Sequence, residues 1–272
     1  MKKFMIMKSS NIADCLKIKE MRLVFVLARS DLQKRFSGSF FGIFWMLIQP
    51  IVSVIIYYWV FQLGFKSNPV ESIPYVAWLL PGIVPWFYFN DAIINGITSF
   101  VVYRHWVKKL SFNISILPFV RILASLFLHI IFMVIMIVVI IIYGNAPSAW
   151  WFQGIYYIVA NTILVTSIVY FLASINVFVK DIVQLINVLL QFGFWLAPIM
   201  YEQEIMPVWI QKILILNPFT YIVRGYRDTF LFKIGFWDRP IDTIRFWVMV
   251  LILVGLGMMT YKRLEDHFAD VL

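Results

Sequence analysis

Long stretches without charged side chains constrain most strongly how this chain can fold. Residues 36–65 contain no Asp, Glu, Lys or Arg, and in residues 122–179 only His129 could carry a charge. A helix of about 20 residues rises about 30 Å, the thickness of the hydrocarbon core of a bilayer. Only 14% of the 272 residues are charged, against about a quarter in a soluble domain. The sequence therefore predicts an integral membrane protein with almost no soluble mass.

Six spans follow from the positions of the charges and of one turn signal. Residues 122–179 are too long for one span, and the sequence GNAPS at 144–148 is a turn signal that divides them. No apolar run with a cleavage site follows the basic start of the chain, so we expect no cleaved signal peptide. We predict an all-α membrane protein with a cytosolic N-terminal segment over 1–38 and a six-span domain over 39–272. The spans are expected at about 39–63, 75–100, 119–143, 151–176, 182–201 and 242–261.

The distribution of basic residues predicts the orientation of these spans. With the N-terminus inside, the inner segments hold fifteen Lys and Arg residues and the outer segments six. Because cytoplasmic loops are enriched in basic residues, both termini are expected in the cytosol. Attraction to anionic lipid explains most of the net charge of +9. Nucleic acid is a poor partner, because the chain has no soluble basic domain to hold it.

Residues 15–36 are predicted to form an amphipathic helix in the inner membrane interface. One face carries apolar side chains at helical spacing: Ile18, Met21, Phe25, Leu32 and Phe36. Another face carries polar side chains: Lys19, Arg22, Arg29 and Gln33. A helix of this kind lies in the plane of the interface. Two roles fit it, a simple membrane anchor or a lever that joins a cytosolic partner to the first span.

The stretch LNPFTYIVRGYRDTF, residues 216–230, is too polar to cross a bilayer and too apolar for an ordinary loop. Pro207 and Pro218 suit the first turns of two helices, and Asn217 is disfavoured in the α conformation because it precedes a proline. We expect helices over about 207–216 and 218–232, both too short to cross the hydrocarbon core. This hairpin is either static in the outer interface or a lid over the mouth of a pore.

Motifs of the common enzymes are absent from the sequence. It contains no H-E-x-x-H, no G-x-S-x-G, no D-x-D pair and no Cys/His cluster, so neither a catalytic nor a metal site is expected. The phosphate loop G-x-x-x-x-G-K-[ST] is also absent. Asp91 is an acid well inside a predicted span, and a structural hydrogen-bonding role fits it as well as a proton relay. The sequence indicates a passive membrane subunit that is driven from elsewhere.

Seven short stretches of the sequence carry a family resemblance. They are LQKRFSGSFFGIFWMLIQP (32–50), LLPGIVPWFYF (79–89), VKKLSFNISILPFVRIL (107–123), NVFVKDI (176–182), FWLAPIMY (194–201), LNPFTYIVRGYRD (216–228) and FADVL (268–272). In this order they resemble the corresponding stretches of ABC-2-type polysaccharide exporter permeases. No single stretch is specific to the family, but all seven occur in the same order, and the resemblance extends from about residue 15 to the end of the chain. The resemblance is greatest to O-antigen exporters, with capsule and wall teichoic acid exporters nearby.

The resemblance implies a homodimeric permease that works with two copies of a separate ATPase subunit. It would move a lipid-linked polysaccharide, most of all O-antigen on a polyprenyl diphosphate, to the outer leaflet of the bacterial inner membrane. ATP and Mg would be bound by the ATPase, and this chain would hold no cofactor. The alternatives are an exporter of the same architecture for a drug or small lipid, and a membrane-embedded transferase, which the missing catalytic motifs disfavour.

Four sets of site residues are predicted. Aromatic rings suit low-specificity contact with a moving glycan, and those expected on the substrate path are Tyr57, Tyr58, Trp86 and Tyr88. Basic side chains suit a diphosphate headgroup, and those expected where it gains access are Arg22, Arg29, Lys34 and Arg35. The resemblance implies an outer gate in residues 203–236, where side chains would contact the sugar or hold the hairpin in place: Tyr221, Arg224, Tyr226 and Arg227. It also implies an ATPase-coupling segment at 104–117, with Arg104, Trp106, Lys108, Lys109 and Leu110. Interface anchoring and attraction to ordinary anionic lipid are the alternatives for the aromatic and basic sets.

Overall fold

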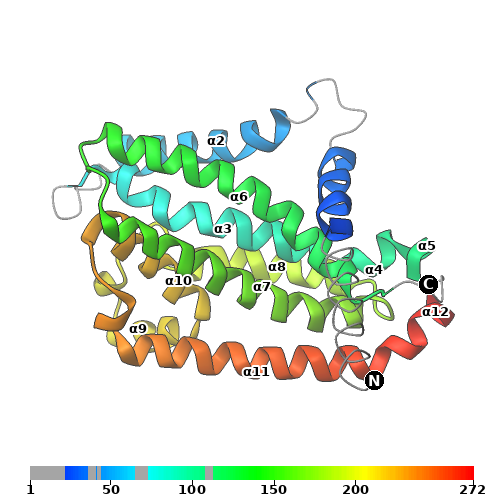
Figure 1. Ribbon diagram of the computed structural model, residues 1–272. Helices are drawn as coiled ribbons and strands as arrows, with labels where there is room; N and C mark the ends of the chain where they lie inside the picture. The colour runs from blue at the N-terminus through cyan, green and yellow to red at the C-terminus, as the bar shows by residue number, and fades with distance from the viewer. Residues whose placement is uncertain (1–21, 36–40, 42–43, 65–72, 108–112) are drawn as a thin grey trace, which may run out of the picture.

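The chain folds into a bundle of helices with roughly parallel long axes (Figure 1). The computed structural model describes residues 22–35, 41, 44–64, 73–107 and 113–272, and every element in these ranges is helical. The helix of residues 22–35 stands across one end of the bundle, together with α4 (Ser99–Val102), α5 (Arg104–Val107) and α12 (Phe268–Val271). The hairpin of α9 (Val208–Leu216) and α10 (Pro218–Arg227) lies at the other end. We call these the C-terminal end and the hairpin end.

Three helical stretches in the described ranges are long and apolar enough to cross a bilayer. They are α6 (Ile116–Ile142), η3 with α7 (Ala149–Phe152 and Gln153–Asn176), and α11 with η7 and α12 (Pro240–Leu264, Glu265–His267 and Phe268–Val271). The other three expected spans coincide with shorter or more polar helices. These are α2 with its π-helical continuation η2 (Trp45–Tyr57 and Tyr58–Gly64), α3 (Tyr75–Ile97) and α8 (Ile182–Leu196). Their crossing of the membrane, and so the total of six spans, stays a prediction.

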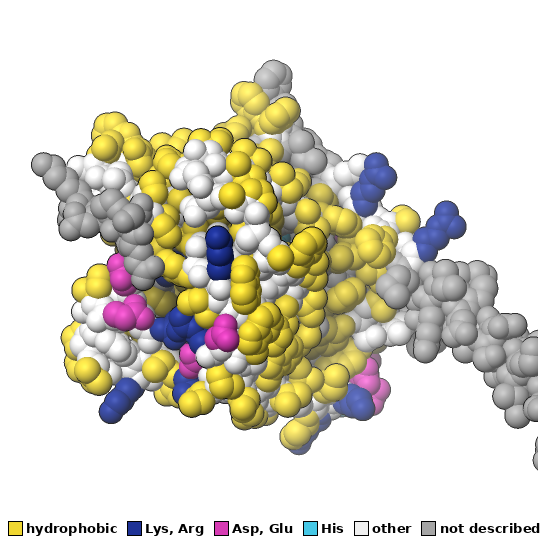
Figure 2. Space-filling view, turned by 60° about the vertical axis from the view of Figure 1, so that its left-hand side comes forward, with side chains coloured by type: hydrophobic (Ala, Val, Ile, Leu, Met, Phe, Trp, Pro, Cys, Tyr) yellow, Lys and Arg dark blue, Asp and Glu magenta, His cyan; other side chains and the backbone are white. Residues whose placement is uncertain are grey.

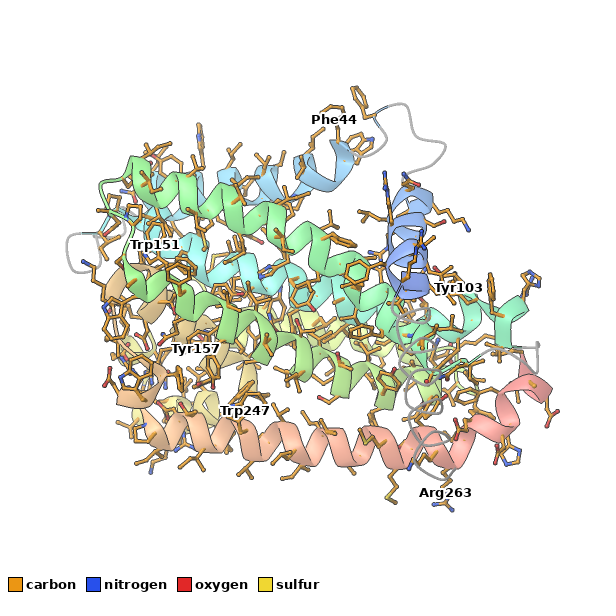
Figure 3. The ribbon with its side chains drawn as sticks, viewed as in Figure 1. Phe44, Tyr103, Trp151, Tyr157, Trp247 and Arg263 are labelled. Carbon is orange, nitrogen blue, oxygen red and sulfur yellow. The ribbon has the colours of Figure 1, made fainter. Side chains whose placement is uncertain are left out.

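Helix α3 forms the centre of the bundle. It packs against α6, α7, α8 and α10, and Ile83 and Ile93 are among the most deeply buried side chains of the protein. Polar groups at this depth pair with neighbouring helices, as hydrocarbon offers them no partner: the Tyr88 hydroxyl donates to Thr162 Oγ1 of α7 over 3.0 Å. Tyr157 of α7 points into the same interior (Figure 3). The residues that α3 presents to its neighbours therefore decide where polar sites can form.

The hairpin has two short helices where the sequence predicts them, followed by the π-helical turn η5 (Asp228–Phe232). Asn217 caps α10, because its side-chain oxygen accepts a hydrogen bond from the Phe219 amide over 3.0 Å. The apolar face of α10 is buried inside the protein, against α3, α7 and α11. Its most buried large side chains are Phe219, Ile222, Val223, Tyr226 and, in η5, Phe230. The second helix of the hairpin thus belongs to the core of the bundle. Around the hairpin lie the single turns η4 (Gln203–Ile205) and η6 (Phe236–Asp238).

The helix of residues 22–35 packs on the bundle through small and charged residues. Its buried residues are Val24, Ala28 and Asp31, and the first two pack on α6. Phe25, on the apolar face that the sequence places in the membrane interface, is 50% exposed, and its contact with the membrane stays a prediction. A small Ala28 lets the helix approach α6 closely, and the buried ion pairs of Asp31 fix the rotation. Ile18, Met21 and Phe36 lie outside the described residues.

Two glycines of α11 give a matched test of how closely this helix packs on α7. A Cβ at Gly257 would lie 2.8 Å from the carbonyl oxygen of Ser167, whereas a Cβ at Gly255 would meet nothing within 4 Å. Gly257→Ala is expected to push the two helices apart and to lower the melting temperature of the detergent-solubilised protein. Gly255→Ala is expected to keep or raise it, since alanine favours a helix by up to about 1 kcal/mol over glycine. Equal melting temperatures for the two variants would contradict this packing.

Candidate functional site

A groove of about 500 Å³ lies between α2, α3 and α8. Aromatic rings form much of its wall: the ring of Phe194 lies 5.6 Å from that of Trp86 and 5.7 Å from that of Tyr57. Amide and carboxylate side chains reach the same space. A concave cleft that combines aromatic rings with a few polar groups is a common form of ligand site. We call it the aromatic groove, and its principal lining residues are Ser53, Tyr57, Trp86, Asn90, Asp91, Gln191, Phe194 and Trp195.

Of the four aromatic residues predicted on the substrate path, Tyr57 and Trp86 line this groove. Tyr88 faces the opposite side of α3, where it is 2% exposed and its ring lies 4.9 Å from that of His129. Residues two apart on a helix point about 200° apart, so residues 86 and 88 cannot line one surface. Tyr58 is half-buried at the point where α2 continues as a π-helix. The transport role of all four stays a prediction.

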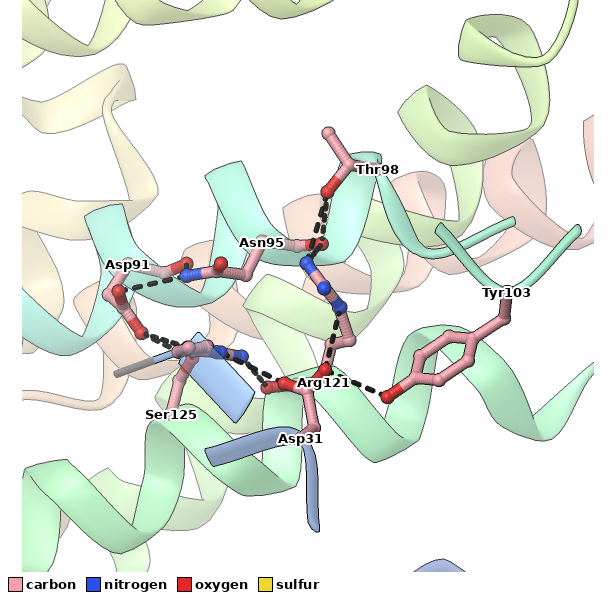
Figure 4. Close-up of polar contacts among 8 residues, drawn as sticks. Asp31, Asp91, Asn95, Thr98, Tyr103, Arg121 and Ser125 are labelled. Atoms are coloured by element: carbon pink, nitrogen blue, oxygen red, sulfur yellow. Dashed lines mark hydrogen bonds and ion pairs between the residues drawn. The ribbon is translucent and has the colours of Figure 1, made fainter. Parts of the chain in front are cut away.

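Two aspartates and two arginines tie the helix of residues 22–35 to α3 and α6 (Figure 4). Arg35 lies 2.9 Å from Asp31 through Nε and 3.1 Å from Asp91 of α3 through Nη1. Arg121 of α6 lies 3.3 Å from Asp31, which also accepts a 2.7 Å hydrogen bond from the Tyr103 hydroxyl. Ions buried to this degree are stable only when paired and hydrogen-bonded. We call Asp31, Arg35, Asp91 and Arg121 the charge bracket.

Arg35 differs from the other basic residues that are predicted to meet a lipid headgroup, because it belongs to the charge bracket. Arg22, Arg29 and Lys34 are exposed on their helix. The Arg35 side chain is only 11% exposed, and its guanidinium also donates to Ser125 Oγ and to the Arg121 carbonyl oxygen. A headgroup would have to displace these partners. In this structure Arg35 holds three elements together, and Asp91, bound by Arg35 and Ser125, has the structural role that the sequence left open.

At the hairpin end, Arg227 of α10 is buried against α3. Its Nη1 and Nη2 donate to the carbonyl oxygens of Pro198 and Ile199, which follow α8, over 2.7 and 2.6 Å. Its guanidinium carbon lies 3.5 Å above the Trp78 ring of α3, a cation–π contact. A Cβ at position 82 would lie 2.9 Å from Nη2, so the close approach depends on Gly82. Burial lowers the Arg227 pKa to about 9, and it remains charged at neutral pH.

The other residues predicted at the outer gate also contact the protein itself. The Tyr226 hydroxyl lies 2.8 Å from His129 Nε2 in the core. The Tyr221 hydroxyl bonds to that of Tyr156 over 2.9 Å. Arg224 pairs with Asp242 of α11 and with Glu204. All four side chains therefore hold the hairpin in place in this structure, and contact with a sugar stays a prediction.

A second hollow, of about 450 Å³, opens beside Arg227 at the hairpin end. Basic side chains flanked by acidic ones are visible near the middle of this face (Figure 2). The charges are arranged in pairs, such as Arg239 Nε with Asp228 at 3.1 Å. The principal polar residues that line this hollow are Glu202, Gln203, Glu204, Arg224, Arg227, Asp228 and Arg239. Paired charges of this kind stabilise the hairpin end and leave no clear excess of one sign.

Comparison with known families settles what kind of membrane protein carries these features. The sequence profile of a family described as "ABC-2 type transporter" matches residues 22–231. The chain belongs to the ABC-2 type transporter family. The matched region contains the aromatic groove, the charge bracket and α10 with most of η5. Members of this family are transport subunits, and the family implies an ATP-binding-cassette ATPase as partner.

Curated relatives of this ABC-2 transporter permease include several O-antigen export proteins. It is 26% identical over 253 residues to the O-antigen export system permease protein RfbA of Klebsiella pneumoniae, an alignment that covers 92% of this chain and 95% of the relative. Its identity to the RfbA protein of Myxococcus xanthus is 24%, over 76% of this chain and 80% of that one. The inner membrane transport permease YadH of Escherichia coli is 23% identical, over 80% of this chain and 87% of YadH.

The segment expected to couple this permease to an ATPase lies at the C-terminal end. Arg104 is exposed on α5, and Trp106 is half-buried with its ring packed against the core of the bundle. Lys108, Lys109 and Leu110 lie outside the described residues. The ring of Trp106 thus already contacts the permease, and its seating in an ATPase groove stays a prediction.

Several residues of the site were missed from the sequence. The sequence analysis assigned no role to Asp31 or Arg121, although each is less than 10% exposed. The available signal was Arg121, a charged residue within a long apolar helix and four residues before Ser125. A charge inside a span requires a partner. Asn90 and Gln191 of the groove gave a similar signal, because each is an amide within an apolar run.

Arg227→Lys tests whether the planar guanidinium is needed at the hairpin end. A lysine ammonium is a point charge that cannot reach two carbonyl oxygens and stack on Trp78 at once. A buried carbonyl that loses its donor costs about 1–3 kcal/mol, so we expect a clear fall in the melting temperature in detergent. Arg245→Lys is the matched control, because Arg245 is one-third exposed and pairs within α11. Wild-type stability of Arg227→Lys would contradict this role.

The buried carboxyl of Asp228 gives the hairpin end a specific pH dependence. Burial raises its pKa from 3.8 to about 6, although the nearby Arg239 acts in the opposite direction. Because the folded pKa is above the unfolded one, this site stabilises the fold fully below pH 3.8, and the effect is lost as pH rises through about 6. The wild type should therefore gain stability relative to Asp228→Asn between pH 7.5 and 5, by at most about 3 kcal/mol. A difference between the two proteins that does not change with pH would contradict this.

Proposed function

We propose that this ABC-2 transporter chain is the membrane subunit of an exporter of a lipid-linked polysaccharide, with O-antigen as the cargo. The supporting observation is the alignment with an O-antigen export permease along nearly the full length of both chains. The aromatic groove is consistent with such a cargo. A sugar ring has apolar C–H faces that can stack on Tyr57 and Trp86, and a rim of hydroxyl groups that amides such as Asn90 and Gln191 can bind.

The proposal includes the architecture implied by the resemblance. Six spans cross the inner membrane, with both termini in the cytosol, and two copies of the chain place their grooves around a common path. Two ATP-binding-cassette subunits bind ATP and Mg and supply the energy, and this chain hydrolyses no ATP. Large apolar side chains exposed on α2 and α8 beside the groove, such as Ile55 and Leu189, favour coverage of this face by a second copy or lipid.

A second candidate is an ABC-2 type exporter of a drug or small lipid. The similarity to YadH supports this candidate, because the name of YadH specifies transport without naming a cargo. The two candidates differ in the length of the cargo. The successive sugar units of a long glycan must move past the groove without stopping, whereas a small molecule is bound and released once.

Deletion of the gene in its native host tests the cargo. We expect surface polysaccharide to disappear and the lipid-linked form to accumulate inside the cell, with both effects reversed by the plasmid-borne gene. Tyr57→Ala should reduce the export rate because it removes one ring of the groove, while Trp59→Ala, at a 67% exposed position two residues away, should not. Export is measured by surface labelling, at equal amounts of permease in the membrane.

Two results would contradict the proposal. One is a normal surface polysaccharide in the deletion strain, and a changed sensitivity to small lipophilic compounds in that strain would then favour the second candidate. The other is an equal loss of export in Tyr57→Ala and Trp59→Ala, which would remove the groove from the path.

A further inference from the structure

Asp91 belongs to the wall of the aromatic groove and to the charge bracket at the same time. Its side chain is 40% exposed and lines the groove beside Asn90. One carboxylate oxygen accepts hydrogen bonds from Arg35 and Ser125, and the other accepts one from Asn95. Part of this carboxylate is therefore open to whatever occupies the groove, while the rest is held by the helix of residues 22–35 through Arg35.

Arg35 makes the two sites interdependent. It holds Asp31 at 2.9 Å and Asp91 at 3.1 Å, so its single positive charge is shared between two carboxylates. If the helix of residues 22–35 moved away from α3, Asp91 would lose its counter-charge in a partly apolar groove, which is costly. By thermodynamic reciprocity, a ligand that stabilises the Asp91 carboxylate in the groove weakens the hold of Asp91 on Arg35.

The chemistry of the carboxylate selects the ligand. An ionised aspartate only accepts hydrogen bonds, so the groove offers it to donors such as the hydroxyl groups of a sugar. A phosphate or diphosphate carries negative charge and would be repelled by it. The amide of Asn90 can donate to or accept from the same hydroxyl groups. This part of the groove therefore fits the glycan of the proposed cargo rather than its lipid diphosphate.

We propose that Arg35 and Asp91 are positioning residues that link glycan hydroxyl groups in the aromatic groove to the position of the helix of residues 22–35. The inference rests on the proposed function. Glycan bound at Asp91 loosens the Arg35 contact, and the helix, which lies at the same end as α5, passes this change to the ATPase. The cargo thereby raises the rate of ATP hydrolysis.

ATP hydrolysis by the permease–ATPase complex in lipid nanodiscs tests the link. The probes are the lipid-linked glycan extracted from the deletion strain and a polyprenyl diphosphate without sugars. The wild-type complex should be stimulated by the first and much less by the second. Asp91→Asn keeps the size of the side chain but removes its charge, and charge-assisted hydrogen bonds are about twice as strong as neutral ones. We expect the half-stimulating concentration of the glycan to rise about tenfold or more.

Matched variants separate this role from a merely structural one. Arg35→Gln should lose the stimulation, while Arg263→Gln, at an exposed position of α11, should keep it. Asp91→Glu, which retains the acceptor charge, should recover at least part of the stimulation that Asp91→Asn loses. Melting temperatures and the yield of assembled complex are measured for every variant, so that a folding defect is recognised as such.

Three results would overturn the inference and leave the exporter function standing. They are wild-type stimulation and half-stimulating concentration in Asp91→Asn, the same loss in Arg263→Gln as in Arg35→Gln, and equal stimulation of the wild type by both probes. A wild-type complex that neither probe stimulates, together with a deletion strain that exports normally, would contradict the proposed function as well.

Discussion

A charge below the surface of a membrane protein is stable only if it has charged or hydrogen-bonding partners, and three arginines with such partners hold the central helix. Arg227 stacks on Trp78 near the start of α3. Arg35 pairs with Asp91 further along, and Arg121 donates to the carbonyl oxygen of Asn95 one turn later. Between these attachments α3 presents Trp86 and Asn90 to the aromatic groove. The groove therefore depends on contacts made by other elements at either end of it.

The sequence predicted the elements well where local chemistry determines them. Charge-free runs located the apolar helices, and Asn217 with Pro218 located the start of α10. It failed where tertiary contacts decide. The face through which the helix of residues 22–35 packs is set by Asp31 and its partners on α6, which no periodicity reveals. Nor does the sequence reveal that Asp228 forms its ion pair with Arg239.

The candidate site was predictable only in part, for a geometric reason. Aromatic residues could be recognised as a class, but their direction depends on the rotation of α3 in the bundle. Trp86 faces the groove, and Tyr88, two positions on, faces the interior between α6 and α7. The roles expected for basic residues divided in the same way: Arg29 is exposed, whereas Arg35 and Arg227 are bound inside the protein.

The two ends of this ABC-2 transporter permease differ in how they hold charge. At the C-terminal end, four charged residues join a helix that crosses the bundle to the wall of the groove. At the hairpin end, Arg227 fixes the turn after α8 to α3 by two short hydrogen bonds. A displacement of the helix of residues 22–35 would therefore act directly on Asp91 in the wall of the groove. A motion of the hairpin would first have to break the two hydrogen bonds of Arg227.

Photo-crosslinking during export tests most directly whether the aromatic groove is the path of the cargo. A photoreactive amino acid is placed at Gln191 in the groove, and in a control protein at Leu251, which is 67% exposed on α11. The account predicts that irradiation of exporting cells attaches glycan to the protein labelled at 191 and only lipid to the protein labelled at 251. Glycan attached equally at both positions, or only at 251, would contradict it.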